Sequence, residues 1–191
     1  MSLFAVFLIG IGLSMDAFAV SVCKGLALEK YKWRYSTVAG IYFGIFQAAM
    51  PLIGFFLGER FKDYISAIDH WIAFVLLGII GLNMIRESRN KEESCPIYPN
   101  QDKAFSPKAM IPLAVATSID ALAVGITFAF LHVRILPAVL LIGVTTFTIS
   151  FAGVRIGNIF GSRFKSKAEL AGGIILILMG FRILIEHLGG V

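Results

Sequence analysis

The pattern of hydrophobic and polar positions divides the chain into six long apolar stretches joined by polar segments. The stretches run over residues 3–23, 36–58, 69–86, 109–131, 135–157 and 168–187. Each is close to the length of about 20 residues with which an α-helix crosses the hydrocarbon core of a bilayer. Because lipid offers no hydrogen bonds, a spanning segment must pair its own backbone groups, as a helix does. The pattern therefore predicts an all-α integral membrane protein with six transmembrane helices.

Composition supports this prediction and excludes a soluble domain. Of the 191 residues, 58% are hydrophobic and 15% are charged, whereas soluble domains carry about 25% charged residues. The first apolar stretch has polar residues at its centre and no small-residue cleavage site. We therefore expect it to be a retained helix rather than a signal peptide.

The basic residues predict the orientation in the membrane. Lys and Arg are concentrated in the first, third and fifth predicted loops, whereas the second loop has only Arg60 and Lys62 and the fourth only Arg134. Because cytoplasmic loops are rich in Lys and Arg, loops one, three and five are predicted to be cytoplasmic and both termini outside. The excess of 17 basic over 12 acidic residues then reflects topology, and no nucleic-acid partner is expected. Cys23 and Cys95 fall on the cytoplasmic side, where thiols stay reduced.

The two halves of the chain resemble each other. The first group of equivalent positions, at an offset of 104 residues, pairs Ser14, Asp16, Ala17, Ala19 and Val20 with Ser118, Asp120, Ala121, Ala123 and Val124. The second group, at an offset of 99 residues, pairs Gly44, Gly54, Gly58, Phe61, Gly81 and Glu87 with Gly143, Gly153, Gly157, Phe160, Gly180 and Glu186.

An odd number of helices in each repeat has a consequence for topology, because the second repeat must enter the membrane in the opposite orientation. We therefore predict two inverted three-helix repeats, residues 1–88 and 108–191, joined by a cytoplasmic linker at residues 89–107. Inverted repeats are a common basis of alternating access, so this organisation favours a transporter. The oligomeric state stays open, a homo-oligomer included.

Asp16 and Asp120 place a carboxylate near the centre of the first and fourth predicted helices. Each costs about 2.5–3.5 kcal/mol at the centre of a membrane helix, so a pair at equivalent positions needs a compensating role. One interpretation is structural, with the aspartates protonated or paired with Arg155 or Arg182. The other is a shared site near the membrane midplane, in which the two carboxylates bind a cation.

Hydroxyl groups lie close to both aspartates along the chain. Ser14 precedes Asp16 by two residues, and Thr117 and Ser118 come shortly before Asp120. These hydroxyls either ligate the cation or bond back to their own helix.

The second predicted helix offers further oxygen ligands. Pro51 is expected to break this helix and to free the backbone carbonyl of Gln47, whose side chain supplies another oxygen. In the fifth helix, Thr146 occupies the position equivalent to Gln47 within a stretch rich in hydroxyls. Carboxylate, amide, hydroxyl and carbonyl oxygens together suit Mg2+, Ca2+ or Mn2+. The thioethers of Met15 and Met50 would admit a softer metal, although Met15 points about 100° away from Asp16 on a regular helix.

Other ionisable residues are predicted at the two membrane surfaces. Glu87 and Glu186 end the third and sixth helices at opposite mouths, where they either attract cations to gates or are simply solvated helix ends. The three histidines, His70, His132 and His187, fall at the outer interface, and their role stays open.

The energy source is inferred from what the sequence lacks. It has no G-x-x-x-x-G-K-[ST] motif and no loop large enough for a nucleotide-binding domain, so no cofactor is expected besides the transported ion. We hypothesise exchange against protons, because a carboxylate pair that releases a dication must either be protonated or stay charged in the membrane.

Several motifs, in order, resemble a known family. They are SMDAFAVSVCKG, FGIFQAAMPLIG, HWIAFVLLGIIGLNMI, ATSIDALAVG and KAELAGGIILILMGF, and the resemblance is to the bacterial MntP-type manganese efflux pumps. It covers nearly the whole chain apart from residues 90–106. It implies six spans in two repeats, a plasma-membrane location and export of Mn2+ from the cytoplasm. It also implies that Asp16 and Asp120 are the family's two intramembrane aspartates.

Two alternatives to Mn2+ export remain at this point. The first is export of another divalent cation, such as Cd2+, Ca2+ or Mg2+. The second is an intramembrane aspartyl protease, in which two aspartates share one proton. Neither aspartate has the G-x-G-D context of such a protease, so the chain is predicted not to be an enzyme.

Overall fold

The computed structural model describes residues 3–65, 101–131 and 133–160, with single helical positions between residues 74 and 86 and between 170 and 185. All regular structure in this part is helical. The helices are α1 (Leu3–Leu26), α2 (Trp33–Ile65), α4 (Gln101–Ala104), α5 (Pro107–Ala116), α6 (Ile119–Phe130) and α7 (Ile135–Phe160).

Three of the described helices, α1, α2 and α7, are long and apolar enough to cross a membrane. The pair α5 and α6 makes a fourth candidate span, bent by 44° where the two helices meet. The prediction of an all-α membrane protein is therefore confirmed for the described part of the chain. The third and sixth predicted spans fall mostly outside it.

The helices extend further than the apolar pattern predicts. Lys24 was expected in the first loop but lies in the last turn of α1. Arg34 and Arg60 were also expected in loops and lie on α2. Long basic side chains can end in the interface while their stems cover apolar surface, so a helix can continue past its hydrophobic stretch. Cys23, expected as a reduced thiol, is disulfide-bonded, and that expectation is wrong.

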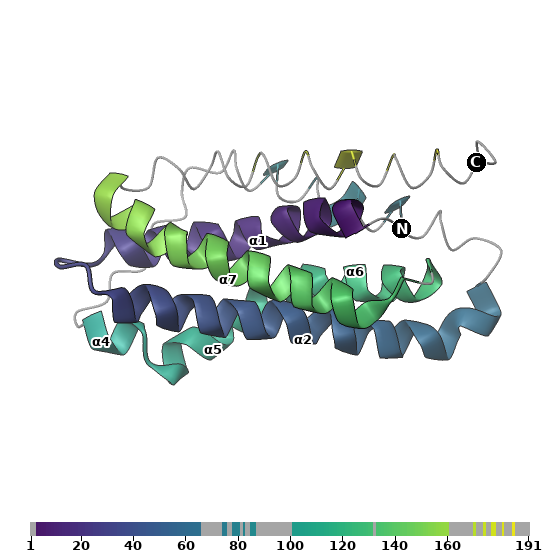
Figure 1. Ribbon diagram of the computed structural model, residues 1–191, viewed down its shortest axis with the longest axis horizontal. Helices are drawn as coiled ribbons and strands as arrows, with labels where there is room; N and C mark the ends of the chain where they lie inside the picture. Colours follow the sequence, from purple (N-terminus) through teal and green to yellow (C-terminus); the bar gives the residue numbers. More distant parts are fainter. Residues whose placement is uncertain are drawn as a thin grey trace.

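The contacts between helices give their relative directions (Figure 1). α1 and α7 run the same way, because Gly10 lies against Ile142 and Gly25 against Val154. α2 runs opposite to α7, since Gly40 lies against Phe147 and Gly44 against Gly143.

The third pair of packed helices is α2 and α6, which run the same way. Gly54 lies against Leu122 and Gly58 against Ala129. α6 therefore runs opposite to α1, its counterpart in the first half of the chain, and α7 runs opposite to its counterpart α2.

Equivalent glycines let the backbones approach closely in both pairs of parallel helices. A Cβ added at Gly54 would lie 2.1 Å from the carbonyl oxygen of Leu122. At the equivalent Gly153 it would lie 3.2 Å from the carbonyl oxygen of Phe18, which is the counterpart of Leu122. Small residues at such crossings are typical of packed membrane helices, where lipid supplies no hydrophobic drive for association.

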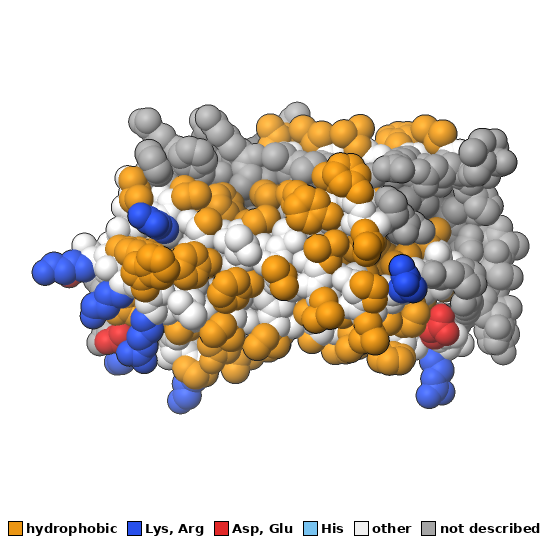
Figure 2. All heavy atoms as spheres, in the orientation of Figure 1, with side chains coloured by type: hydrophobic (Ala, Val, Ile, Leu, Met, Phe, Trp, Pro, Cys, Tyr) orange, Lys and Arg blue, Asp and Glu red, His pale blue; other side chains and the backbone are white. Residues whose placement is uncertain are grey.

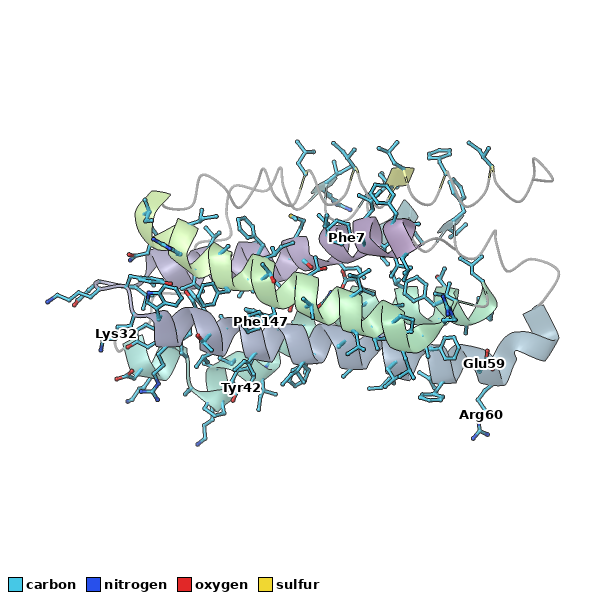
Figure 3. The ribbon with its side chains drawn as sticks, in the orientation of Figure 1. Phe7, Lys32, Tyr42, Glu59, Arg60 and Phe147 are labelled. Atoms are coloured by element: carbon cyan, nitrogen blue, oxygen red, sulfur yellow. The ribbon has the colours of Figure 1, made fainter. Side chains whose placement is uncertain are left out.

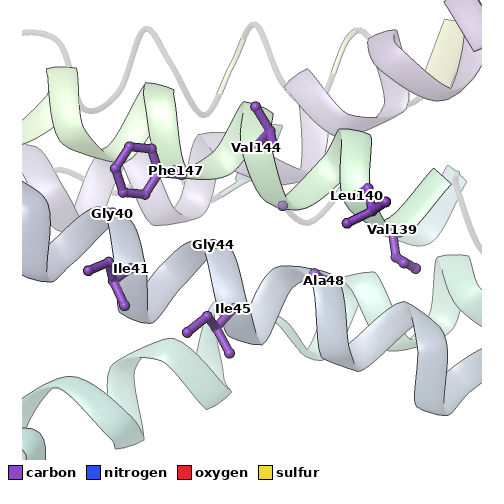
Figure 4. Close-up of a pocket in the computed structure, with 10 residues that line it drawn as sticks. Gly40, Ile41, Gly44, Ile45, Ala48, Val139, Leu140, Val144 and Phe147 are labelled. Atoms are coloured by element: carbon purple, nitrogen blue, oxygen red, sulfur yellow. The ribbon is translucent and has the colours of Figure 1, made fainter. Parts of the chain in front are cut away.

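A shallow apolar groove marks the crossing of α2 and α7 on the outer surface (Figure 4). Its lining residues form equivalent pairs of the two halves: Gly40 with Val139, Ile41 with Leu140, Gly44 with Gly143, Ile45 with Val144 and Ala48 with Phe147. At the centre, a Cβ on Gly44 would lie 3.0 Å from the carbonyl oxygen of Gly143. The crossing therefore joins the two halves through the same five positions of each.

The surface has the distribution of a membrane protein. Figure 2 shows hydrophobic side chains over the middle of the described face and charged side chains near its two ends. Lys32 lies at one end of the bundle, and Glu59 and Arg60 lie at the other (Figure 3). Large apolar side chains between them are exposed, among them Leu136 at 66% and Val144 at 64%. Such exposure suits contact with lipid.

The buried apolar residues form two clusters. The first apolar cluster consists of Ala5, Val6, Ile9, Leu13, Ala121, Val124, Phe128, Val133, Ala138 and Ile142. The second apolar cluster consists of Ala17, Leu28, Tyr35, Ala39, Phe43, Ala104, Phe105, Met110, Ala114 and Val154. Met15 and Met50, whose thioethers were considered as ligands, pack against the first cluster.

Candidate metal site

The predicted site residues lie where the two apolar clusters meet. On α1, on α7 and along α5 and α6 they fall between the last residue of one cluster and the first residue of the other, and on α2 Gln47 lies between Phe43 of the second cluster and Met50, which packs against the first. We call this set the polar layer: Ser14 and Asp16 on α1, Gln47 on α2, Thr117, Ser118 and Asp120 at the junction of α5 and α6, and Thr146 on α7. The structure thus places predicted ligands from both halves of the chain at one level of the bundle.

Ser14 and Thr146 are in direct contact across the α1–α7 interface. Their hydroxyl oxygens are 2.8 Å apart, and both side chains are fully buried. Ser14 Oγ also lies 2.6 Å from the carbonyl oxygen of Gly10, to which it donates. A hydroxyl carries one proton, so Thr146 then donates to Ser14. Lone pairs on both oxygens remain available to a cation.

Gln47 crosses from α2 to α1. Its Nε2 donates to the carbonyl oxygen of Leu13 at 3.0 Å, and the side chain is fully buried. Within the described part of the chain, its Oε1 has no hydrogen-bond partner. A buried acceptor left unsatisfied costs about 1–3 kcal/mol. A cation bound in the polar layer would satisfy this oxygen. The buried side chain of Gln47 therefore fits the role predicted for it, that of a cation ligand.

The predicted helix break at Pro51 is wrong. α2 continues as one helix through this proline. Pro51 removes a single backbone hydrogen bond, and close packing keeps the helix in place: a Cβ on Gly125 would lie 2.2 Å from the Pro51 carbonyl oxygen. α2 therefore offers two candidate ligand oxygens at Gln47: its side-chain Oε1 and its backbone carbonyl, which Pro51 deprives of the usual donor.

The break lies instead in the fourth span, between Ala116 and Ile119. Ser118 Oγ donates to the carbonyl oxygens of Ala114, at 2.7 Å, and Val115, at 3.1 Å, and Thr117 Oγ1 donates to Ala114 at 3.3 Å. Hydroxyls that compete for backbone carbonyls in this way bend helices. The two hydroxyls therefore bond back to their own helix, as one of the two sequence interpretations expected.

This break gives Asp120 a different setting from Asp16. Asp120 lies in the first turn of α6, and its Oδ1 accepts a hydrogen bond from the backbone N–H of Ala121 at 2.8 Å. The N-terminal end of a helix carries partial positive charge and stabilises a carboxylate. Asp16 is also partly buried but lies within the unbroken α1. Sequence reasoning missed this asymmetry, although the adjacent Thr117 and Ser118 were a signal for it.

Other predicted residues lie outside the part of the chain that the structure describes. Glu87 and Glu186, the predicted gating residues, lie outside the described residues, as do His70, His132 and His187. In the described ranges, no three or more His, Cys, Asp or Glu side chains come together in a metal-binding group. A cation in the polar layer would therefore need neutral oxygen ligands in addition to the carboxylates of the two aspartates.

Sequence reasoning also missed a buried lysine at one end of the bundle. Lys24 is only 4% exposed, and its Nζ donates to the carbonyl oxygen of Ala104 at 2.5 Å. The same ammonium lies 5.3 Å from the centre of the Phe105 ring, which stacks on Tyr35 at 4.7 Å. Tyr35 donates to Asp102 Oδ1 at 2.9 Å. Residues 101–106 are thereby held against the end of α1 and the start of α2.

Comparisons with known proteins point to one family. The family profile described as "Putative manganese efflux pump" matches residues 30–184. Proteins named "Putative manganese efflux pump MntP" are similar along their lengths. That of Desulfitobacterium hafniense is 63% identical, covering 96% of this chain and 94% of the relative. That of Acetivibrio thermocellus is 58% identical, covering 99% and 93%. That of Mannheimia succiniciproducens is 54% identical, covering 98% of each.

No solved structure matches the chain. The profile covers far more than half of the sequence, and the relatives are similar over nearly all of it. Their shared name describes a transporter rather than an enzyme. The chain belongs to the MntP family of manganese efflux pumps.

Proposed function

We propose that this protein exports Mn2+ from the cytoplasm through a cation site in the polar layer. The observation that carries the proposal is the arrangement of the layer itself. Two aspartates at equivalent positions of the two halves accompany a buried Ser14–Thr146 pair and the unsatisfied Oε1 of Gln47. The names of the relatives supply the identity of the ion.

The ligand chemistry supports a hard dication. The proposed ligands are carboxylate, amide and hydroxyl oxygens, which Mn2+ shares with Mg2+ and Ca2+. They are Asp16, Asp120, Gln47, Ser14, Ser118, Thr117 and Thr146. A doubly charged ion between two carboxylates neutralises both, which offsets the cost of charges inside a membrane.

The transport cycle is proposed to use two inverted three-helix repeats. The opposite directions of α1 and α6, and of α2 and α7, support this arrangement. Rocking of one repeat against the other would expose the site to each side in turn. The crossing at Gly44 and Gly143, which the two halves share, is where we place the pivot.

Proton exchange is the proposed coupling. When the dication leaves, the aspartates must take up protons or remain charged in the membrane. Entry of protons from outside would then drive release of Mn2+ there. In this scheme loops one, three and five are cytoplasmic, both termini are outside, and Glu87 and Glu186 act at the two mouths.

Transport into inverted membrane vesicles tests the proposal. Vesicles carrying the wild-type protein are expected to accumulate Mn2+ faster when a proton gradient is imposed with the acidic side in the vesicle lumen, which corresponds to the outside of the cell. Asp16→Asn and Asp120→Asn should each reduce this uptake at least 100-fold while the protein still inserts, because a neutral amide cannot balance the charge of the dication. Glu29→Gln, which removes an exposed charge from the loop after α1, is the matched control.

Several outcomes would contradict the proposal. Mn2+ uptake that persists after each aspartate substitution would exclude the two-aspartate site. Mn2+ uptake that does not change with the pH gradient would exclude proton exchange. Uptake of Cd2+, Ca2+ or Mg2+ at a rate equal to or above that of Mn2+ in the same vesicles would exclude selectivity for Mn2+.

A further inference from the structure

Two buried hydroxyls between α1 and α7 lie outside the polar layer. Ser21 and Ser150 are both completely buried. Neither Oγ has a hydrogen-bond partner within the described part of the chain. A buried hydroxyl without a partner is unfavourable, and a group of this kind in a native structure calls for an explanation.

Hydroxyls elsewhere in the bundle make hydrogen bonds within their own helices. Ser14, Ser118, Thr127 and Thr148 each donate to the carbonyl oxygen four residues earlier, at distances between 2.6 and 3.2 Å. This bond is the usual one for a hydroxyl within a helix. Ser21 and Ser150 do not make it, although both lie within regular helix.

The two hydroxyls continue the line of polar groups from the layer. Ser150 lies one turn after Thr146 and therefore on the same face of α7, toward α1. Ser21 lies two turns after Ser14 on α1. It contacts the turn of α7 that follows Ser150, since a Cβ added at Gly153 would lie 2.9 Å from the Cβ of Ser21. The line runs from Ser14 and Thr146 toward the end of the bundle where α1 ends.

Polar groups also occupy that end of the bundle. Asn158 Nδ2 donates to the carbonyl oxygens of Gly25, at 3.3 Å, and Leu28, at 2.8 Å. Lys24 is buried one turn from Ser21. The hydroxyls therefore lie between the polar layer and a polar end of the interface rather than in an isolated apolar pocket.

The equivalent interface in the other half of the structure, between α2 and α6, lacks these two hydroxyls. The counterparts of Ser21 and Ser150 are Gly125 and Pro51, neither of which has a polar side-chain atom. Close packing does not distinguish the two interfaces: a Cβ on Gly125 would lie 2.2 Å from the Pro51 carbonyl oxygen, and a Cβ on Gly25, between α1 and α7, would lie 2.0 Å from the Val154 carbonyl oxygen. Of the two equivalent interfaces, only the one between α1 and α7 carries a pair of hydroxyls.

We propose that Ser21 and Ser150 are transient ligands for a partly dehydrated divalent cation that moves between the polar layer and the end of α1. This inference rests on the proposed export of Mn2+. Hydroxyl oxygens are hard ligands that suit such a cation, and an ion of this kind keeps part of its water shell while it is handed on. The pair would serve the route to one side of the membrane, since the counterpart positions carry no hydroxyls.

The first experiment compares alanine variants in inverted vesicles. Ser21→Ala combined with Ser150→Ala is expected to raise the KM for Mn2+ about tenfold, the loss expected for hydroxyl contacts to a charged ion. The melting temperature of the purified protein should not fall, because the substitutions remove unsatisfied polar atoms. Thr148→Ala, an exposed hydroxyl on α7 that bonds to its own helix, should leave the KM unchanged.

The second experiment replaces Ser150 by cysteine. A thiol on the cation's route is expected to bind Cd2+, a soft metal, so Ser150→Cys should make Mn2+ transport at least tenfold more sensitive to Cd2+ than in the wild type. Thr148→Cys should not. This readout stays informative if the double alanine variant fails to fold, because Ser→Cys changes volume little.

The outcomes separate the two proposals. If the wild-type protein accumulates Mn2+ and the double alanine variant has an unchanged KM, the two hydroxyls do not bind the transported cation. An active Ser150→Cys protein with wild-type sensitivity to Cd2+ would overturn the subsite as well. Wild-type vesicles that accumulate no Mn2+ would overturn the export function, and the subsite with it.

Discussion

Single side chains in the polar layer combine high burial with spare acceptor capacity. Ser14, Gln47 and Thr146 are fully buried, and each keeps oxygen lone pairs beyond the hydrogen bonds it makes. In a membrane protein such oxygens are costly unless a polar partner visits them. The residues therefore suit a site that a cation occupies during part of a cycle.

Replacing Gln47 tests this interpretation. Gln47→Leu keeps much of the volume but removes Oε1, and we expect the KM for Mn2+ in inverted vesicles to rise about tenfold. The carbonyl oxygen of Leu13 loses its donor, so the melting temperature should fall as well. Gln47→Glu keeps an acceptor oxygen and should retain more transport than Gln47→Leu. Equal activity of both variants and the wild type would exclude Gln47 as a ligand.

The sequence singled out several buried residues of the polar layer, and their role as ligands stays a prediction. The type and spacing of Ser14, Gln47 and Thr146 indicated ligands, and the structure places the first two near each other and the third against Ser14. Lys24 was misplaced because a charged residue at the edge of an apolar stretch reads as loop. Only the packing of residues 101–106 reveals why it is buried.

At the scale of the elements, the sequence misled most about where a helix breaks. Proline is the usual signal for a break, yet α2 passes through Pro51 without one. The fourth span breaks at Thr117 and Ser118, whose hydroxyls compete for the carbonyls of α5. The existence of the helices followed from hydrophobic length alone, whereas their continuity depends on local hydrogen bonds and on neighbouring helices.

Close backbone contact between α2 and α6 gives a prediction about stability. Gly54→Ala places a methyl group 2.1 Å from the carbonyl oxygen of Leu122, so the backbones must separate. We expect a loss of about 1–3 kcal/mol, seen as a lower melting temperature in detergent.

Gly78 supplies the matched control for this substitution. A Cβ at Gly78 meets nothing within 4 Å, so Gly78→Ala should leave the melting temperature unchanged or raise it slightly. A Gly54→Ala protein as stable as the wild type would contradict the close packing of α2 on α6.

At the scale of the whole molecule, two apolar clusters enclose a polar layer, and the same helix contacts occur in both halves. The internal repeat was visible in the sequence because equivalent glycines and aspartates keep their spacing. The layer itself was not visible, since it depends on which helices pack together. α1 contacts α7 extensively and its neighbour α2 hardly at all, so each half is completed by helices of the other.

Anomalous scattering from Mn2+ in crystals of the protein tests the central claim most directly. We predict one strong manganese peak in the polar layer, within coordination distance of Asp16 or Asp120 and of a neutral oxygen from Gln47, Ser14 or Thr146. The peak should vanish in crystals of Asp16→Asn or Asp120→Asn. A transport-competent protein whose manganese lies elsewhere in the bundle, or stays in the layer after both substitutions, would contradict the account.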